Sequence, residues 1–175
     1  KQVLCSENPC TAKSEDFHYS VPYAFRKGFR TEKGQHMSEM VKVVVDAMGG
    51  DNAPEEPVKA AVEAVKEKEN IQVILTGVQD VIEAELRKYP DYPKDRIRVV
   101  HASQVIETAE PPVMAIQKKK DSSIVVGLNL VKKQEADAFV SSGSTGAVLV
   151  GGQVIVGRIQ GIRRPPLAPL IPTAK

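Results

Sequence analysis

Two loops of this 175-residue sequence concentrate the residue types that bind anions and orient polar substrates. The first loop covers residues 46–54 and contains two adjacent glycines, Gly49 and Gly50. Because glycine has no Cβ, the backbone here could approach a ligand closely. The same loop carries three polar side chains that could position a substrate, and we take them as candidate catalytic residues: Asp46, Asp51 and Asn52.

The second loop, residues 141–147, reads Ser-Ser-Gly-Ser-Thr-Gly-Ala and lies between an expected strand and an expected helix. Hydroxyl groups, free backbone N–H groups and the positive end of a helix together suit a phosphate group. A purely structural turn is the alternative, but its N-cap needs only one hydroxyl, and residues 141–145 hold four. We therefore favour an anion site, whose candidate phosphate- or substrate-binding residues are Gly49, Gly50, Ser142, Gly143, Ser144, Thr145 and Gly146.

Basic residues farther along the chain could add to such a site. Arg158, Arg163 and Arg164 come after the second loop, and the guanidinium group suits bidentate contacts with phosphate. We include Arg164 among the candidate binding residues, although a solvated helix end explains any single arginine equally well. The lysine run at 118–120 is interpreted as a solvated helix end, with the docking of an acidic partner as the alternative.

Motifs for several other chemistries are missing from the sequence. It lacks the P-loop pattern GxxxxGK, the dinucleotide pattern GxGxxG, the zinc motif HExxH and the hydrolase elbow GxSxG. Both cysteines, Cys5 and Cys10, precede residue 36, and His101 is the only histidine after it. A single histidine at a strand end is usually structural. We expect no metal, no cofactor and no thiol nucleophile, and the residues identify no general base.

Short apolar segments alternate with amphipathic ones from residue 41 onward. Strands are expected at 41–45, 71–75, 97–100 and 138–140, helices at 55–68, 78–88, 111–119, 123–133 and 146–158, and a fifth strand at 165–173. This alternation predicts a three-layer α/β/α fold with a mostly parallel sheet, and it leaves the strand order open. Both loops then follow strands, and ligands of open parallel sheets bind outside the carboxyl ends of the strands.

The composition excludes several classes of protein. Lysine and arginine total 24 against 22 acidic residues, so the formal net charge of +2 gives no electrostatic case for binding nucleic acid. Hydrophobic residues make up 42%, which is typical of a globular chain. No apolar run reaches the length of a membrane span and no secretory signal is recognisable, so we expect a cytoplasmic protein.

Residues 1–36 differ from the rest of the chain. They hold both cysteines and five of the eight Phe and Tyr, without strand alternation or a helical apolar stripe. We interpret them as a disordered extension, with a small docking arm as the alternative, and assign residues 37–175 to the folded domain. The final apolar segment lacks a covering helix, which predicts that this domain is the N-terminal part of a longer protein.

Several motifs resemble those of the PlsX-type phosphate acyltransferases of bacterial phospholipid synthesis. These are VVVDAMGGDNAP at 43–54, HASQVI at 101–106, QKKKDSS at 117–123, ADAFVSSGSTGA at 136–147 and GRIQGIRRPPLAPLIPT at 157–173. They follow the family's order and spacing over residues 41–175. Three positions depart from the family pattern: Ser142 and Pro166 stand where it has Ala, and Ser144 where it has Asn.

The resemblance implies a homodimer with a fold similar to isocitrate dehydrogenase and phosphotransacetylase. It implies transfer of a fatty acyl group from acyl carrier protein to inorganic phosphate, without a cofactor. The acyl phosphate product would supply a membrane-bound glycerol-3-phosphate acyltransferase, so a cytoplasmic enzyme could associate peripherally with the membrane. Family members are about twice as long as the matched part, which would leave this chain inactive alone. Two alternatives stay open: a non-catalytic fragment or binding module, and a dehydrogenase-like enzyme sharing the fold.

Overall fold

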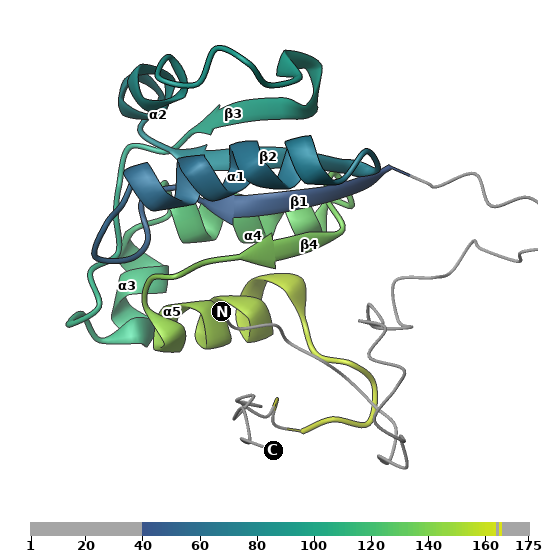
Figure 1. The fold of residues 1–175 in the computed structure, drawn as a ribbon. Helices are drawn as coiled ribbons and strands as arrows, with labels where there is room; N and C mark the ends of the chain where they lie inside the picture. The colour runs from purple at the N-terminus through teal and green to yellow at the C-terminus, as the bar shows by residue number, and fades with distance from the viewer. Residues whose placement is uncertain (1–39, 164, 166–175) are drawn as a thin grey trace, which may run out of the picture.

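Four parallel strands form a sheet in the order β3-β2-β1-β4 (Figure 1). They are β1 (Val41–Asp46), β2 (Ile71–Gly77), β3 (Ile97–His101) and β4 (Ala138–Val140). The computed structural model describes residues 40–163 and residue 165. The predicted extension at 1–36, Arg164 and nearly all of the predicted fifth strand at 165–173 therefore lie outside the described residues.

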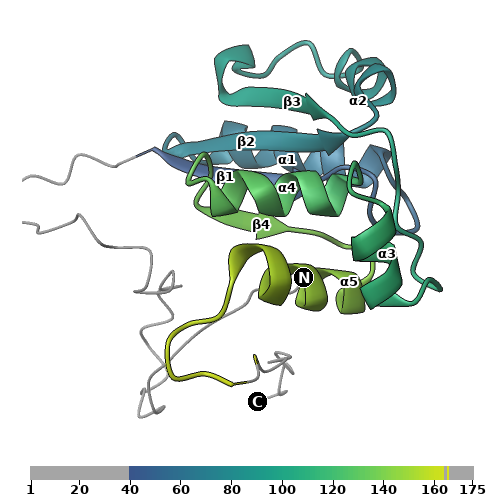
Figure 2. The same ribbon diagram turned by 180° about the vertical axis from the view of Figure 1, so that it is seen from behind.

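Helices cover both faces of this sheet. In Figure 1 helix α1 (Glu55–Glu67) lies in front of the strands, and in the reverse view of Figure 2 helix α4 (Ser123–Lys132) lies in front of them. Helix α2 (Gln79–Leu86) shares the core on the α1 side. The other elements of the described residues are the short 3₁₀ helix η2 (Lys94–Arg96), α3 (Pro112–Lys118), α5 (Thr145–Gly151) and the π-helical segment η3 (Gly152–Val156). The predicted three-layer α/β/α fold is thus confirmed.

The alternation of side chains along the strands explains the two covered faces. On β2, Val73 and Leu75 pack with the apolar stripe of α1, whereas Ile74 packs on the opposite face with Leu130 and Val131 at the end of α4. Successive residues of a strand point to opposite sides, so a strand buried on both faces reads as a continuous apolar run. Such runs are what made the strands recognisable in the sequence.

The helix that begins at Thr145 changes its winding along its length. Helix α5 passes directly into η3, which Gly157 ends with a φ of +109°. The predicted helix at 146–158 is therefore confirmed as helical, but its second half is wound more widely than an α-helix. The junction is tightly packed, because a Cβ on Gly151 would lie 2.5 Å from Cδ1 of Leu128 on α4. Among the described residues, no helix combines the length and apolar character needed to cross a membrane.

The order of the strands reverses between β1 and β4. From β1 the chain moves outward to β2 and β3, and it then returns past β1 to add β4 on the other side. Ligands of open parallel sheets bind in the crevice at such a reversal, outside the carboxyl ends of the strands. The two loops at 47–54 and 141–144 follow β1 and β4 directly. The fold therefore brings both predicted loops to this point.

Candidate functional site

Asp46 and Ser141 lie side by side at the carboxyl ends of β1 and β4. The strand register pairs Val45 of β1 with Val140 of β4, so the residues that follow them, Asp46 and Ser141, also lie opposite each other. The hydroxyl of Ser141 donates a hydrogen bond of 2.7 Å to Oδ2 of Asp46. This bond joins the two strands at the reversal of the strand order.

The carboxylate of Asp46 is buried and accepts a hydrogen bond on each oxygen. The residue is 1% exposed, and its Oδ1 accepts a bond of 3.1 Å from the backbone N–H of Met48. The Ser141 oxygen also accepts a bond of 3.0 Å from the backbone N–H of Gly143. Because an ionised carboxylate can only accept, these bonds run in one direction, from Gly143 through Ser141 to Asp46.

A second hydrogen bond ties the two loops together, and glycines make room for it. The hydroxyl of Ser142 donates a bond of 2.9 Å to the carbonyl oxygen of Gly49. A Cβ on Gly49 would lie 2.5 Å from Oδ2 of Asp46, and one on Gly50, whose φ is +100°, would lie 2.9 Å from Oγ of Ser142. In the structure the two glycines therefore accommodate the neighbouring loop, and their predicted contact with a ligand stays a prediction.

Ser144 is the N-cap of α5. It is 3% exposed, and its Oγ accepts a hydrogen bond of 3.3 Å from the backbone N–H of Ala147. Ser and Asn are both favoured N-caps, because their side-chain oxygens reach the unpaired N–H groups of the first helical turn. This explains physically why serine can replace the asparagine of the resembled motif. The bond uses the Ser144 oxygen as an acceptor, so it does not commit the hydroxyl proton.

The three serine hydroxyls of the second loop thus have structural partners. Ser141, Ser142 and Ser144 make the bonds described above, and Thr145 also takes part in an interaction. The number of hydroxyls in this loop therefore gives less support to an anion site than the sequence alone indicates. Phosphate binding by residues 142–146 stays a prediction, supported by the position of the loop in the fold.

Gly146 lies against α3. A Cβ on Gly146 would be 2.6 Å from Cγ of Pro112, the first residue of that helix. The absence of a side chain at this position therefore lets α3 pack against the first turn of α5. This packing places α3 beside the second loop, as Figure 2 shows.

The other two candidates of the first loop face solvent. Asp51 and Asn52 are exposed, and neither side chain forms a hydrogen bond within the described residues. The backbone carbonyl of Asn52 accepts a bond of 3.1 Å from the N–H of Glu56 in the first turn of α1. Their side chains could therefore contact a substrate directly. The buried carboxylate of Asp46 could act on a substrate only through the residues that it contacts.

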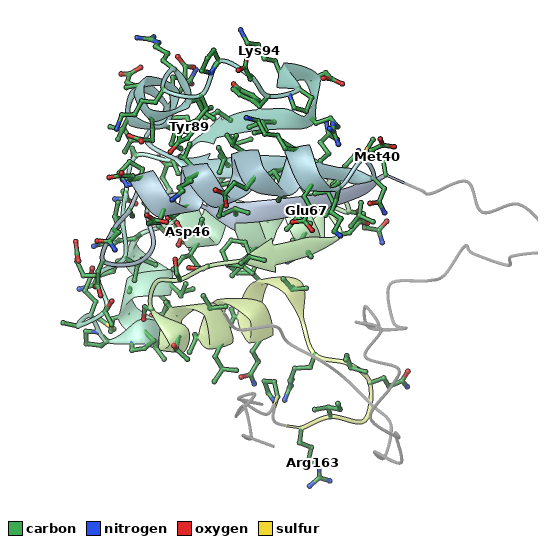
Figure 3. The ribbon with its side chains drawn as sticks, in the orientation of Figure 1. Met40, Asp46, Glu67, Tyr89, Lys94 and Arg163 are labelled. Atoms are coloured by element: carbon green, nitrogen blue, oxygen red, sulfur yellow. The ribbon has the colours of Figure 1, made fainter. Side chains whose placement is uncertain are left out.

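Of the three candidate arginines, the two that the structure describes, Arg158 and Arg163, are not brought to the loops. Arg163 lies on the segment beyond η3, far from Asp46 in Figure 3. Nη1 of Arg158 donates a hydrogen bond of 3.0 Å to the carbonyl oxygen of Arg163, so Arg158 belongs to the same segment. Arg164 lies outside the described residues. Its predicted role in binding phosphate stays a prediction.

The connection from β3 to α4 is fixed by two acidic residues. Glu110 pairs with Nζ of Lys119 at 2.5 Å, and this hydrogen bond is the main reason that the pKa of Glu110 is lowered. Asp121 accepts bonds from the hydroxyl and backbone N–H of Ser103, at 2.5 and 3.0 Å, which lower its pKa. Lys119 is thus tied to this connection, unlike a lysine of a solvated helix end.

His101 has a structural contact, in agreement with the sequence interpretation. Its Nδ1 accepts a hydrogen bond of 3.3 Å from the backbone N–H of Gln79, at the start of α2. The part of the chain that the structure describes contains no cluster of three or more His, Cys, Asp or Glu residues able to hold a metal ion.

Sequence reasoning did not single out Ser141 among the residues of its loop. A signal was present, because Ser141 directly follows an apolar strand just as Asp46 completes another. Using that signal requires knowing that β1 and β4 are neighbours. The strand order comes only from the structure.

Comparison with known proteins gives a consistent family relationship. The model of the family described as "Fatty acid synthesis protein" matches residues 41–175. A phosphate acyltransferase of Alkaliphilus oremlandii is 58% identical over 135 residues, which are 77% of this chain and 40% of that protein. A phosphate acyltransferase of Clostridium botulinum is 52% identical over 132 residues, 75% of this chain and 39% of that protein. The chain thus spans about two fifths of the length of these curated relatives.

Proposed function

Because the chain belongs to the fatty acid synthesis protein family, the PlsX family that its motifs resemble, we propose that the whole protein is a phosphate acyltransferase. In this proposal it transfers a fatty acyl group from acyl carrier protein to inorganic phosphate and so produces acyl phosphate. The product serves phospholipid synthesis.

One structural observation supports assigning the proposed function to particular residues. The loops after β1 and β4 are joined by the Ser141–Asp46 and Ser142–Gly49 hydrogen bonds at the reversal of the strand order. A loop held in place by these bonds can present backbone N–H groups to an anion without reorganising. We assign phosphate binding to residues 142–146, and substrate positioning to Asp51 and Asn52.

The proposed reaction needs no covalent enzyme intermediate. An oxygen of phosphate attacks the thioester carbonyl, the C–S bond breaks, and the carrier thiol leaves with the proton released by phosphate. Holding the phosphate close to the carbonyl and stabilising the tetrahedral oxyanion are then the main tasks of the protein. Polar loops at strand ends suit both tasks.

We extend the proposal to the partners of the whole protein. They are acyl carrier protein as acyl donor, inorganic phosphate as acceptor, a second copy of the chain in a homodimer, and a membrane-bound glycerol-3-phosphate acyltransferase that takes the product. This places the protein in the cytoplasm, with peripheral contact to the membrane.

The 175-residue chain should bind phosphate but show little turnover. Active sites of this fold class draw on loops from several strand ends, and the curated relatives are more than twice as long as the part they share with this chain. The acyl-chain groove would then depend on residues that the relatives have beyond the match. A binding module without turnover remains the second candidate for the chain by itself.

The test is a graft of residues 41–175 into the Alkaliphilus oremlandii phosphate acyltransferase in place of its matched part. Purified graft and 175-residue chain are each incubated with palmitoyl-acyl carrier protein and phosphate. Acyl phosphate is trapped as hydroxamate, and the released thiol is measured, with a phosphate-free reaction as control. Phosphate-dependent hydroxamate from the graft supports the proposal. A folded graft without it contradicts the proposal.

A further inference from the structure

An anion site at the ends of β1 and β4 lies next to a buried negative charge. Asp46 is the last residue of β1, and Oδ2 of its carboxylate lies within 3.5 Å of the position that a Cβ on Gly143 would occupy. A carboxylate so close to a phosphate-binding turn would repel phosphate, because like charges interact strongly where water is excluded. The site therefore needs donors that hold and compensate this carboxylate.

Ser141 supplies the side-chain donor. Among the described residues, the donors to the Asp46 carboxylate are the Ser141 hydroxyl on Oδ2 and the Met48 backbone N–H on Oδ1. The same Ser141 oxygen accepts from the backbone N–H of Gly143, the central residue of the 142–144 turn. One hydroxyl thus links the buried charge to the turn that follows it.

We infer that Ser141 is a positioning residue for phosphate: it holds the Asp46 carboxylate away from the phosphate and fixes the Gly143 turn that faces it. This inference rests on the proposed phosphate site at residues 142–146. It assigns to Ser141 no contact with phosphate or with the thioester.

Removal of this hydroxyl has two consequences. In Ser141→Ala, Oδ2 of Asp46 loses its side-chain donor and the N–H of Gly143 loses its acceptor. A buried polar group without a partner is costly, so the carboxylate and the turn will rearrange toward other donors. Because the proposed phosphate site at residues 142–146 follows Ser141 directly, we expect this rearrangement to weaken phosphate binding. The acyl transfer step itself is not affected, because Ser141 touches no reacting atom.

The experiment uses the active graft of residues 41–175 and measures KM for phosphate and kcat separately. We expect Ser141→Ala to raise KM for phosphate about tenfold, the usual order for a lost hydrogen bond to a charged group, with kcat within about twofold. Ser141→Thr retains the hydroxyl and should return KM to near the unsubstituted value. Melting temperatures of all variants show whether the fold is kept.

Ser103, which lies just beyond the carboxyl end of β3, offers a matched control. Ser103 donates its hydroxyl to the carboxylate of Asp121 at 2.5 Å, so Ser103→Ala removes a bond of the same type outside the two loops. This variant should leave KM for phosphate unchanged. An equal rise in both alanine variants would show a general effect of stability and would overturn the positioning role.

A double-mutant cycle separates the charge effect from loss of packing. If Ser141 acts by holding the charge of Asp46, then Ser141→Ala will change phosphate affinity much less when Asp46→Asn is already present. Equal effects of Ser141→Ala in both backgrounds would overturn the inference, as would an unchanged KM in the single variant. Either result leaves the proposed function standing if the graft is active. A folded graft without phosphate-dependent activity overturns the proposed function and this inference together.

Discussion

Gly49 and Gly143 lie so close together that a side chain on either would meet the backbone of the other. A Cβ on Gly49 would lie 2.8 Å from the amide nitrogen of Gly143, and a Cβ on Gly143 would lie 3.1 Å from Cα of Gly49. Real Cβ atoms do not come as close as 2.8 Å to another atom, so there is no room for a side chain between the two loops. Their backbones are in direct contact. The contact brings the chain after β1 against the chain after β4.

Gly49→Ala should destabilise the protein more than Gly143→Ala. The new Cβ of the first variant would meet Oδ2 of Asp46 at 2.5 Å and Oγ of Ser141 at 2.9 Å, so the loops must move apart. In the second variant the new Cβ would lie 3.1 Å from its nearest atom, Cα of Gly49, so a smaller shift of the loops is needed. Overpacking of this kind costs about 1–3 kcal/mol. Thermal unfolding followed by circular dichroism would measure the order, and equal melting temperatures would contradict it.

A larger side chain at Gly143 should remove phosphate binding while the fold persists. In Gly143→Val the branched side chain occupies the space between Gly49 and Ser141, so the turn cannot keep its approach to a ligand. Isothermal titration with inorganic phosphate would measure binding, and far-ultraviolet circular dichroism would confirm the fold. Unaltered phosphate binding would place the site elsewhere, with Arg163 as the next candidate to test.

Ser144→Ala and Ser144→Asn should differ in stability. Alanine removes the side-chain oxygen that accepts from Ala147, and the loss of an N-cap typically costs about 0.5–2 kcal/mol. Asparagine is an equally good N-cap and is the residue of the resembled motif, so its melting temperature should stay near that of the unsubstituted chain. If the asparagine variant were the less stable of the two, the N-cap explanation of this position would be wrong.

Much of the fold followed from the sequence because helices cover both faces of the sheet, and the central strand β2 is buried on both of them. Apolar runs such as the one that ends at Leu75 mark a two-sided strand, and the helices between them show their apolar spacing clearly. The π-helical turn at 152–156 was not foreseeable, because the side-chain pattern of a short apolar helix says little about its winding.

The site was predicted less completely than the fold. Both loops were identified from their residue types, but the partners of those residues depend on which strands are neighbours. The sequence relates Gly49 to a ligand, which stays a prediction, and it gives no sign that Gly49 also lies against Gly143, almost a hundred residues away. Long-range register of this kind has no local signal. The role of Ser141 was missed for the same reason.

Deletion of residues 1–36 should leave both the melting temperature and phosphate binding unchanged. These residues show no periodic apolar face, so they can bury little surface on the domain. The match to the family model begins only at residue 41. Differential scanning calorimetry of the shortened and the 175-residue chains would compare them. A fall of several degrees would show instead that this segment packs on the domain, as the docking-arm alternative requires.

The Ser103–Asp121 pair should make part of the stability depend on acid pH. The hydroxyl of Ser103 is the main cause that lowers the pKa of Asp121 in the folded protein, so the folded value lies below the value of about 3.9 for an unfolded aspartate. The pair therefore stabilises the protein fully above the unfolded pKa and loses this effect as pH falls through the folded one. In Ser103→Ala the pKa of Asp121 returns toward its ordinary value, so the variant has less stability to lose.

The difference in melting temperature between the unsubstituted chain and Ser103→Ala should be largest at neutral pH and should shrink below about pH 4. Melting temperatures measured from neutral pH into this acid range would test it, and a difference independent of pH would show that Ser103 stabilises the loop without acting on the charge of Asp121.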